Sequence, residues 1–226
     1  MAMKSVVKVS AEAQAITILR DQIVTGAFVP GARLIETDLS AGLRIARATL
    51  RQALHHLAQE GLVVLIPYTG WMVIDMTSAD AWELYTLRAS LEALAAKLAA
   101  SSLTELSGRT LQTAMKRLAK SSVSGSFSEA VEADFGLHET IVGLSGNKRL
   151  TEQYRIVGQQ VRMFIAASDA LLISGLTLVH QHQPLVDAIL EADGAQAALL
   201  SEQHNISEGE KLVAHLKARE ARRPAT

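Results

Sequence analysis

The feature that most constrains the fold is a change of pattern near residue 75. Beyond it the chain is rich in Ala and Leu at helical spacing, and no strand pattern appears. Thr77 and Asp80 have the spacing of a capping box before the first long helix, and Ser126 and Glu129 repeat that spacing. This part predicts an all-helical bundle. Its helices are expected from about residue 77 to 100 and over residues 103–121, 127–144, 148–170, 177–192 and 195–218.

The preceding part has a different organisation. Its order is a helix, a short helix, a longer helix and a β-hairpin, which is the order of a winged helix-turn-helix module. In such modules the later helix enters the major groove of DNA. The three helices are expected over residues 11–25, 38–43 and 46–60, and the two strands over residues 62–66 and 71–74.

The fold class predicted for the whole chain is therefore mainly α, in two domains. Residues 1–76 are expected to form the winged helix-turn-helix DNA-binding domain. Residues 77–226 are expected to form the all-helical domain.

Composition excludes several classes of protein. The 226 residues include no cysteine, which rules out disulfides, thiolate nucleophiles, cysteine-ligated zinc and iron–sulfur clusters. No apolar run approaches the roughly 18 residues of a membrane helix, and no signal peptide is visible, so a cytoplasmic protein without a membrane partner is expected. The 22 Lys and Arg balance 23 Asp and Glu, so overall charge neither favours nor excludes nucleic acid.

Local charge is more informative than net charge. Arg47 and Arg51 are four residues apart on the longer helix of the first part, on the side away from its leucine stripe. Leu39 to Gln59 contains no acidic residue, and Arg33 and Arg44 lie just before this helix within reach of phosphates. Two arginines at this spacing are more often a solvated face than a DNA-binding one, so spacing alone leaves both interpretations open.

The second part contains a possible metal site. Asp134 and His138 are four apart in a helical pattern, so both side chains leave one face of the helix. His182 and His204 belong to two later helices, which can bring them together if the helices pair antiparallel. One carboxylate and three imidazoles suit Zn, Ni, Mn or Fe, with positions left for water or ligand. Seven histidines also produce such spacings by chance, so surface or capping histidines remain the alternative.

The first part resembles the GntR superfamily of bacterial transcription regulators. The resemblance lies in Pro30-Gly31, Leu39 to Leu54, Glu60 to Val63, and Pro67 with Gly70. It spans nearly all of residues 15–76 and implies a winged-helix reader of operator DNA. The resemblance implies that Arg33, Arg47, Thr49 and Arg51 contact DNA, with Gly70 at the wing tip. Arg44 is added to this set as a candidate phosphate contact.

The second part resembles the FCD domain, the effector domain of the FadR branch of these regulators. The matching residues are Arg88 with Glu92, Asp134 to His138, Ser145-Gly146-Asn147, His182 and His204, within about residues 80–210. The resemblance implies a divalent metal ion. Zinc is the first candidate, and nickel, manganese and iron are the alternatives. The implied metal ligands are Asp134, His138, His182 and His204.

The same resemblance implies that small carboxylates bind above the metal and that Arg88 pairs with them. Arg162 is a further candidate for the pocket from its place on the predicted helix over residues 148–170. His180 misses the register of the motif. Pro184, close after His182, predicts that its helix begins near His182 or kinks there.

The combined prediction is a homodimeric, ligand-responsive transcription regulator, expected to repress, that binds an inverted-repeat operator and senses a small carboxylate or sugar acid. One alternative is direct metal sensing. Another is a metal-dependent enzyme. Against this alternative, the sequence has no H-E-x-x-H motif, and an enzyme would leave residues 30–70 unexplained. A third is an adaptor with a vestigial winged helix, which the retained arginines disfavour.

Overall fold

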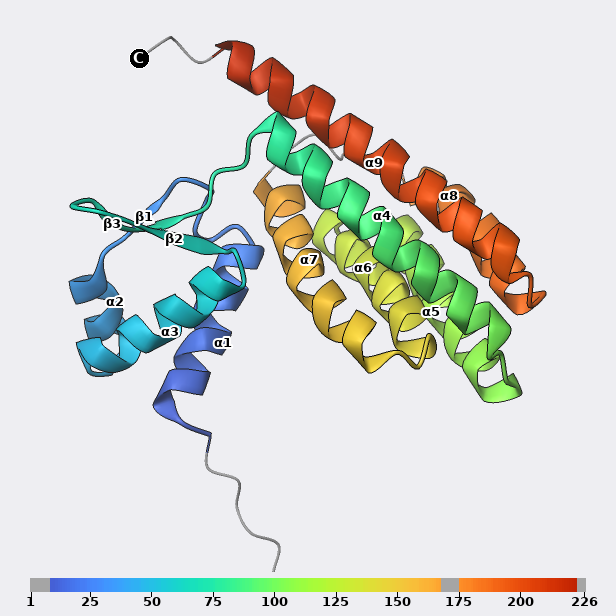
Figure 1. Cartoon of the computed structure of the whole chain (residues 1–226), viewed down its shortest axis with the longest axis horizontal. Coiled ribbons are helices and arrows are strands. Elements are labelled where there is room, and N and C mark those ends of the chain that lie inside the picture. Colours follow the sequence, from blue (N-terminus) through green and yellow to red (C-terminus); the bar gives the residue numbers. More distant parts are fainter. Residues whose placement is uncertain (1–8, 168–174, 223–226) are drawn as a thin grey trace, which may run out of the picture. The chain divides into compact units, whose positions relative to one another are not determined.

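The computed structural model describes residues 9–167 and 175–222 and is mainly helical, as predicted (Figure 1). The chain divides into two compact units. The first is Met1–Asp75 with Arg162–Ala167, and the second is Met76–Val161 with Ser168–Thr226. Within the described residues, no helix combines the length and apolar character needed to cross a membrane.

The first unit combines helices with a small antiparallel sheet of strand order β1-β3-β2. The predicted hairpin is present, and its strands pair from Val63 with Val73 to Ile66 with Gly70. Strand β1 was not predicted, because its two residues are too few to show an alternating pattern. The elements are α1 (Ala11–Val24), β1 (Arg33–Leu34), α2 (Glu36–Leu43), α3 (Arg47–Gln59), β2 (Val63–Ile66) and β3 (Gly70–Val73).

Helix α3 is fixed by its apolar stripe and by one ion pair at its end. Leu50, Leu54 and Leu57 are fully buried, while the arginines of the opposite face are exposed. The guanidinium of Arg20 on α1 donates to both oxygens of Glu60 at 2.8 Å, which ties α1 to the end of α3. The position of α3 is therefore fixed by its buried leucines and by this ion pair, and its polar side stays accessible.

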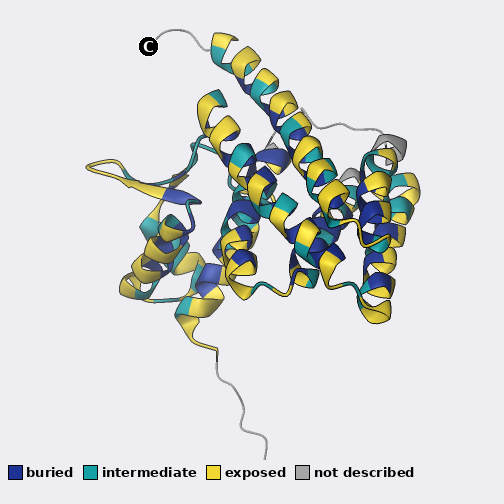
Figure 2. Ribbon diagram, turned by 45° about the vertical axis from the view of Figure 1, so that its right-hand side comes forward, coloured by how far each residue is buried: buried dark blue, intermediate teal, exposed yellow. Residues whose placement is uncertain are grey.

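The second unit is a helical bundle, and both predicted capping boxes are present, at Thr77 with Asp80 and at Ser126 with Glu129. Buried residues follow the faces that the helices turn toward one another (Figure 2). The predicted helix over residues 148–170 ends at Ala167, and its last predicted residues lie outside the described part. The elements are α4 (Ser78–Ser101), α5 (Glu105–Ser124), α6 (Phe127–Leu144), α7 (Lys148–Ala167), α8 (Gly175–Leu190) and α9 (Gly194–Arg222).

Helix α8 begins at Gly175 and runs through Pro184, so it does not begin near His182, and the alternative of a kink at this place stays a prediction. Proline removes one backbone donor, to the carbonyl of the residue four before it. That residue is His180, and both His180 and Pro184 are exposed, so solvent can satisfy the carbonyl that loses its partner.

Helices α4 and α9 lie side by side and antiparallel (Figure 1). The Ser78 backbone N–H and hydroxyl donate to Glu220 at 2.7 and 2.9 Å, and Asn205 donates to Glu92 at 2.8 Å. Between these contacts Gly209 meets the fully buried Tyr85. A Cβ at Gly209 would lie 2.6 Å from the Tyr85 Cβ, so only glycine allows the two helices to approach this closely.

We therefore expect Gly209→Ala to lower the free energy of unfolding by about 1–3 kcal/mol, the usual cost of overpacking. Gly158→Ala is the matched control, because its Cβ would lie 3.6 Å from the nearest atom of Tyr154, an ordinary contact. The control should be neutral or stabilising by up to about 1 kcal/mol through helix propensity. Urea unfolding measures both variants. A Gly209→Ala protein as stable as the control would contradict this account of the helix pair.

Candidate metal centre and nucleic-acid interface

Three histidines from three helices converge in the second unit. One ring nitrogen from each of His138 (α6), His182 (α8) and His204 (α9) lies within 4.8 Å of the others. His138 and His182 are 1% and 0% exposed, and His204 is half-buried. The Asp134 Oδ1 lies 3.2 Å from the His182 Nε2, and its Oδ2 lies 3.9 Å from the His138 Nε2. The four residues predicted to bind metal are thus brought together, whereas the exposed His180 lies apart from the cluster.

The surroundings of two rings define where their protons lie. The His182 Nδ1 is 2.7 Å from the carbonyl of Leu178, which can only accept, so this nitrogen carries the hydrogen. The His138 Nδ1 is 2.7 Å from the Glu92 carboxylate, which likewise accepts. A ring with its hydrogen at Nδ1 presents the lone pair of Nε2, the usual arrangement for a metal-binding histidine.

These two Nε2 atoms face each other at 3.1 Å. Two lone pairs at this separation repel unless a cation lies between them or one ring takes up a proton. Two nitrogens bound to one tetrahedral zinc would lie roughly 3.3 Å apart, close to the separation observed. The donor set and its orientation therefore fit a divalent metal, and the buried triad is consistent with a metal site.

Electrostatics keeps the rings in the form that metals bind. Burial lowers the pKa of His182, although the nearby Asp134 carboxylate opposes the shift. Burial also lowers the pKa of His204 well below its ordinary value, and the neighbouring His182 and His138 lower it further. Both rings are then neutral at neutral pH, and neutral imidazole is the form that coordinates a metal.

Behind His138 lies the buried carboxylate of Glu92. Its Oε1 accepts from the Arg88 Nε and the Tyr154 hydroxyl, each at 2.7 Å, and its Oε2 accepts from the Asn205 amide at 2.8 Å. Burial favours the neutral acid, but the charge of the neighbouring Arg88 guanidinium holds the pKa of Glu92 well below its ordinary value. Glu92 is therefore an anion that orients His138 and Arg88 together.

The role of Glu92 was missed in the sequence, where it appeared only as a motif position. One signal was available: Arg88 and Glu92 are four residues apart in an Ala- and Leu-rich helix. A charged pair on such a helix is either exposed to solvent or buried between helices, and a buried pair would indicate a structural role for Glu92. Tyr154 and Asn205 carried no comparable signal. Their contacts with Glu92 depend on packing between helices that are distant in sequence.

Arg88, the predicted partner of a ligand carboxylate, retains hydrogen-bonding capacity. It is 2% exposed, its Nε is bound to Glu92, and its Nη2 is buried without a hydrogen-bond partner. The Tyr85 hydroxyl, one turn earlier on α4, is also buried and without a hydrogen-bond partner. Leaving buried donors unpaired costs about 1–3 kcal/mol each, which a bound acceptor would recover. Arg162 is half-buried in the part of α7 that groups with the first unit, and its role in the pocket remains a prediction.

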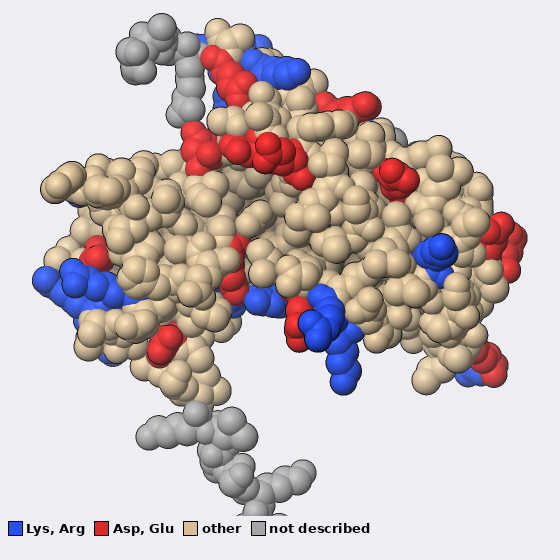
Figure 3. All heavy atoms as spheres, in the orientation of Figure 1, with Lys and Arg blue, Asp and Glu red and all other residues tan. Residues whose placement is uncertain are grey.

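Of the predicted DNA-contacting residues, the four arginines Arg33, Arg44, Arg47 and Arg51 are exposed, whereas Thr49 and Gly70 are half-buried. Figure 3 shows Lys and Arg side chains gathered at the α2 and α3 end of this unit. A hollow of about 410 Å³ lies between the start of α2, the start of α3 and the wing, and Arg33, Arg47 and Gly70 line it. Arg44 ends α2, and Thr49 and Arg51 lie in the first turns of α3.

Backbone geometry explains two of these positions. Arg44 has φ 55°, in the left-handed region that favours glycine, so an arginine at this position is strained. Gly70 has φ 100°, which requires glycine. Neither α2 nor α3 has a side-chain cap at its N-terminus, where Ile35 and Ala46 stand. Their first backbone N–H groups are therefore available to phosphate oxygens.

One residue of this face was not anticipated. Glu36, the first residue of α2, lies with its Oε2 2.7 Å from the Arg51 Nε. The acid-free stretch that marks α3 in the sequence begins at Leu39, three residues after this acid. Its contact joins residues on two helices, which no local spacing predicts.

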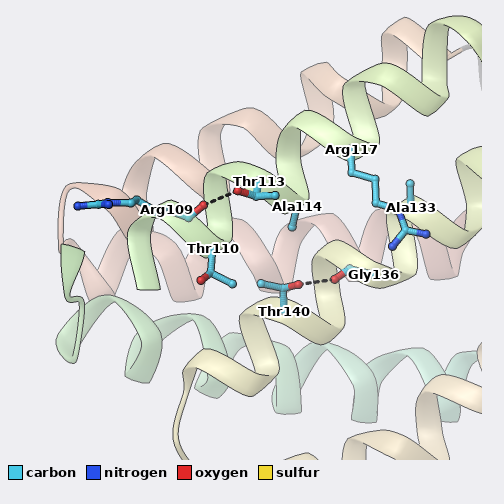
Figure 4. A pocket seen from close by; sticks show the side chains of 8 residues that line it. All are labelled: Arg109, Thr110, Thr113, Ala114, Arg117, Ala133, Gly136 and Thr140. Atoms are coloured by element: carbon cyan, nitrogen blue, oxygen red, sulfur yellow. Dashed lines mark hydrogen bonds between the residues drawn. The ribbon is translucent and has the colours of Figure 1, made fainter. Parts of the chain in front are cut away.

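Helices α5 and α6 border a further groove of about 410 Å³ (Figure 4). The hydroxyls of Thr113 and Thr140 donate to the carbonyls of Arg109 and Gly136, and Arg109 pairs with Glu105. None of the residues lining this groove has a buried polar atom without a partner. The groove therefore lacks the unsatisfied donors that distinguish the surroundings of the histidine cluster.

Comparison with known families matches both units. Residues 11–73 match the family described as bacterial regulatory proteins, gntR family, and residues 83–207 match the FCD domain. The second match covers the histidine cluster with Arg88 and Glu92.

Individual relatives agree with these matches. The Nta operon transcriptional regulator of Aminobacter aminovorans is 32% identical over 60% of this chain, and the aligned region spans 64% of that protein. The repressor GlaR of Escherichia coli is 27% identical over 82% of this chain and 88% of its own length. The solved structure of McbR/YncC from E. coli superposes with a TM-score of 0.77 at 21% identity, covering 94% of this chain and 100% of that one, which shows a shared fold.

The Glu92 network generates a pH prediction. A carboxyl whose pKa is lower in the folded than in the unfolded protein contributes stability above its unfolded value, here about 4.5, and loses it as the pH falls through the folded value. Glu92→Gln should lower the free energy of unfolding at neutral pH by about 3–5 kcal/mol, because Arg88 is left as an uncompensated buried charge. The variant should also lose less stability than the wild type as the pH falls below about 4.5.

Glu105→Gln is the matched control for this measurement. Glu105 also pairs with an arginine four residues away, Arg109, but both side chains are exposed. An exposed pair contributes at most about 1 kcal/mol. Urea unfolding of chelator-treated protein over a pH series compares the two variants. Equal losses for Glu92→Gln and Glu105→Gln would show that the buried network does not stabilise the fold.

Proposed function

The chain belongs to the gntR family of bacterial regulatory proteins, in the branch that carries an FCD domain, and on this premise we propose that it senses a small carboxylate at a metal held in its second unit. The relatives are transcriptional regulators rather than enzymes, and repressors such as GlaR are among them. The protein is a DNA-binding transcriptional regulator. The metal, the effector and the operator belong to the proposal.

The observation that carries this proposal is the convergence of two Nε2 lone pairs in a buried site. The Nδ1 contacts of His182 with Leu178 and of His138 with Glu92 leave the two Nε2 atoms facing each other at 3.1 Å, and His204 and Asp134 complete a set of three imidazoles and one carboxylate. In this proposal Asp134, His138, His182 and His204 hold a divalent ion, with zinc first among Zn, Ni, Mn and Fe. When bound, the ion supplies an open position for one oxygen of a carboxylate.

The chain's own residues select the ligand. Arg88 offers its unpaired Nη2 to the effector carboxylate, and Glu92 holds the guanidinium in place through the Nε. The Tyr85 hydroxyl is a second buried donor one turn away. Arg162 is retained as a candidate for the same pocket. A small carboxylic or sugar acid satisfies these donors, whereas an apolar ligand would leave them unpaired.

Regulation then follows from linkage. An effector changes DNA affinity only by the difference between its affinities for the two arrangements of the DNA-reading heads. In the proposal the protein is a homodimer that reads an inverted repeat, because paired heads of this kind read paired half-sites. The expected mode is repression that the effector modulates.

Direct metal sensing is the second candidate function. The repulsion between the two Nε2 lone pairs favours it, because a cation that relieves this repulsion ties α6, α8 and α9 together without any organic ligand. In this case the metal alone would change operator affinity.

The DNA-reading part of the proposal is tested by removing single arginines. Arg47→Ala and Arg51→Ala should each weaken operator binding by about five- to a hundredfold at fixed salt, the range for a lost base or phosphate contact. Metal content should stay unchanged. Arg109→Ala removes an exposed arginine from α5 and serves as the control. Fluorescence anisotropy with an operator selected from random duplexes measures affinity. If all three variants bind like the wild type, α3 does not read DNA.

The ligand-sensing part is tested by thermal unfolding of zinc-loaded and chelator-stripped protein against a panel of carboxylic and sugar acids. Zinc should raise the midpoint, and one acid should raise it further only when zinc is present, by mass action. His204→Ala should weaken or abolish the zinc effect. Arg88→Met should keep the stabilisation by zinc and lose the further stabilisation by the acid. Arg88→Lys, which preserves the charge, is its control. Stabilisation by zinc with no effect of any acid would favour direct metal sensing.

A further inference from the structure

The DNA-reading face carries an acid where one is unfavourable. The hollow between α2, α3 and the wing is lined by Arg33 and Arg47, and Glu36 contributes the negative charge among its lining residues. DNA phosphates repel an anion at this place, so Glu36 lowers the affinity for every DNA sequence. An acid on such a face costs binding free energy unless it does something that a neutral residue would not.

The structure shows what Glu36 contacts. Its Oε2 lies 2.7 Å from the Arg51 Nε, and the Glu36 side chain is 24% exposed while that of Arg51 is 62% exposed. The acid thus lies nearer the protein and the guanidinium nearer the solvent. The contact uses the Nε, so the two terminal nitrogens of the planar guanidinium remain available to other acceptors. Two parallel N–H groups in a fixed plane are what bidentate recognition of guanine O6 and N7 requires.

We propose that Glu36 is a positioning residue that gives Arg51 its sequence specificity. This inference rests on the proposed function, in which α3 reads operator DNA. Glu36 holds the Arg51 guanidinium in one plane, so that it meets a correctly placed guanine without reorganisation. The same carboxylate competes with DNA phosphates for Arg51, and this competition weakens the binding of Arg51 to DNA of any sequence other than the operator. Both effects raise the ratio of operator affinity to non-specific affinity.

A purely local role predicts something different. An acid in the first turn of a helix stabilises that helix through its dipole, and α2 has two such acids, Glu36 and Asp38. Asp38 is exposed, and its Oδ1 accepts from the Thr37 hydroxyl at 3.1 Å. Asp38→Asn therefore removes the same charge from the same turn of the same helix without breaking the contact with Arg51. It is the matched control for Glu36→Gln.

The experiment measures the affinity of the full-length protein for a selected operator duplex and for a shuffled duplex at one salt concentration. Asp38→Asn should raise both affinities by a similar factor, leaving their ratio unchanged. Glu36→Gln should raise the shuffled-duplex affinity similarly but lower the affinity ratio by about fivefold, at the low end of what a bidentate base contact contributes. In an Arg51→Ala background, Glu36→Gln should no longer change the ratio. Thermal unfolding of each variant checks that the fold is intact.

The outcomes separate this inference from the function on which it rests. Equal behaviour of Glu36→Gln and Asp38→Asn, with Arg51→Ala still weakening operator binding, overturns the positioning role and leaves DNA reading by α3 intact. A change of ratio by Glu36→Gln that persists in the Arg51→Ala background also overturns it, because the effect then bypasses Arg51. If Arg51→Ala and Arg47→Ala leave operator affinity unchanged, the proposed function itself fails.

Discussion

The arrangement of the second unit depends on one buried anion, the carboxylate of Glu92. Removing a carboxylate from water costs several kcal/mol, and this cost is recovered only if its oxygens are fully satisfied. Arg88 on the same helix, His138 on α6, Tyr154 on α7 and Asn205 on α9 supply the partners. Each of these helices must therefore adopt the one register that brings its donor to Glu92. Hydrophobic burial drives the bundle together, and this network selects the way in which it packs.

The same anion connects the fold with the function. It orients the His138 ring so that the Nε2 lone pair faces that of His182, and it holds Arg88 with one nitrogen still unpaired. A metal and a carboxylate ligand would complete two sets of contacts that the fold leaves open, and both sets share Glu92. Binding at this site is thus linked to the register of α4, α6 and α9. Such a link is the physical requirement for a ligand to change the state of a regulator.

Much of the secondary structure was predictable, because it depends on the spacing of residues that are close in the sequence. The helices of both parts, the hairpin and the two capping boxes follow from periodicity and from single residues such as Gly61 and Ser126. The grouping of His138, His182 and His204 followed from the resemblance to the FCD domain rather than from spacing. What escaped prediction was non-local. Strand β1 exists only through its pairing with β3, Tyr154 reaches Glu92 from a helix distant in sequence, and Glu36 meets Arg51 across two helices.

The central claim is that the buried histidines hold a metal ion with a position open to a ligand. X-ray absorption spectroscopy of the zinc-loaded protein tests it most directly, because it reports the atoms bound to the ion. The account predicts about three imidazole nitrogens at roughly 2.0–2.1 Å with a further shell of carboxylate or water oxygen. It also predicts that His204→Ala removes one nitrogen or abolishes binding. A shell made only of oxygens, with no imidazole scattering, would place the metal elsewhere and contradict the account.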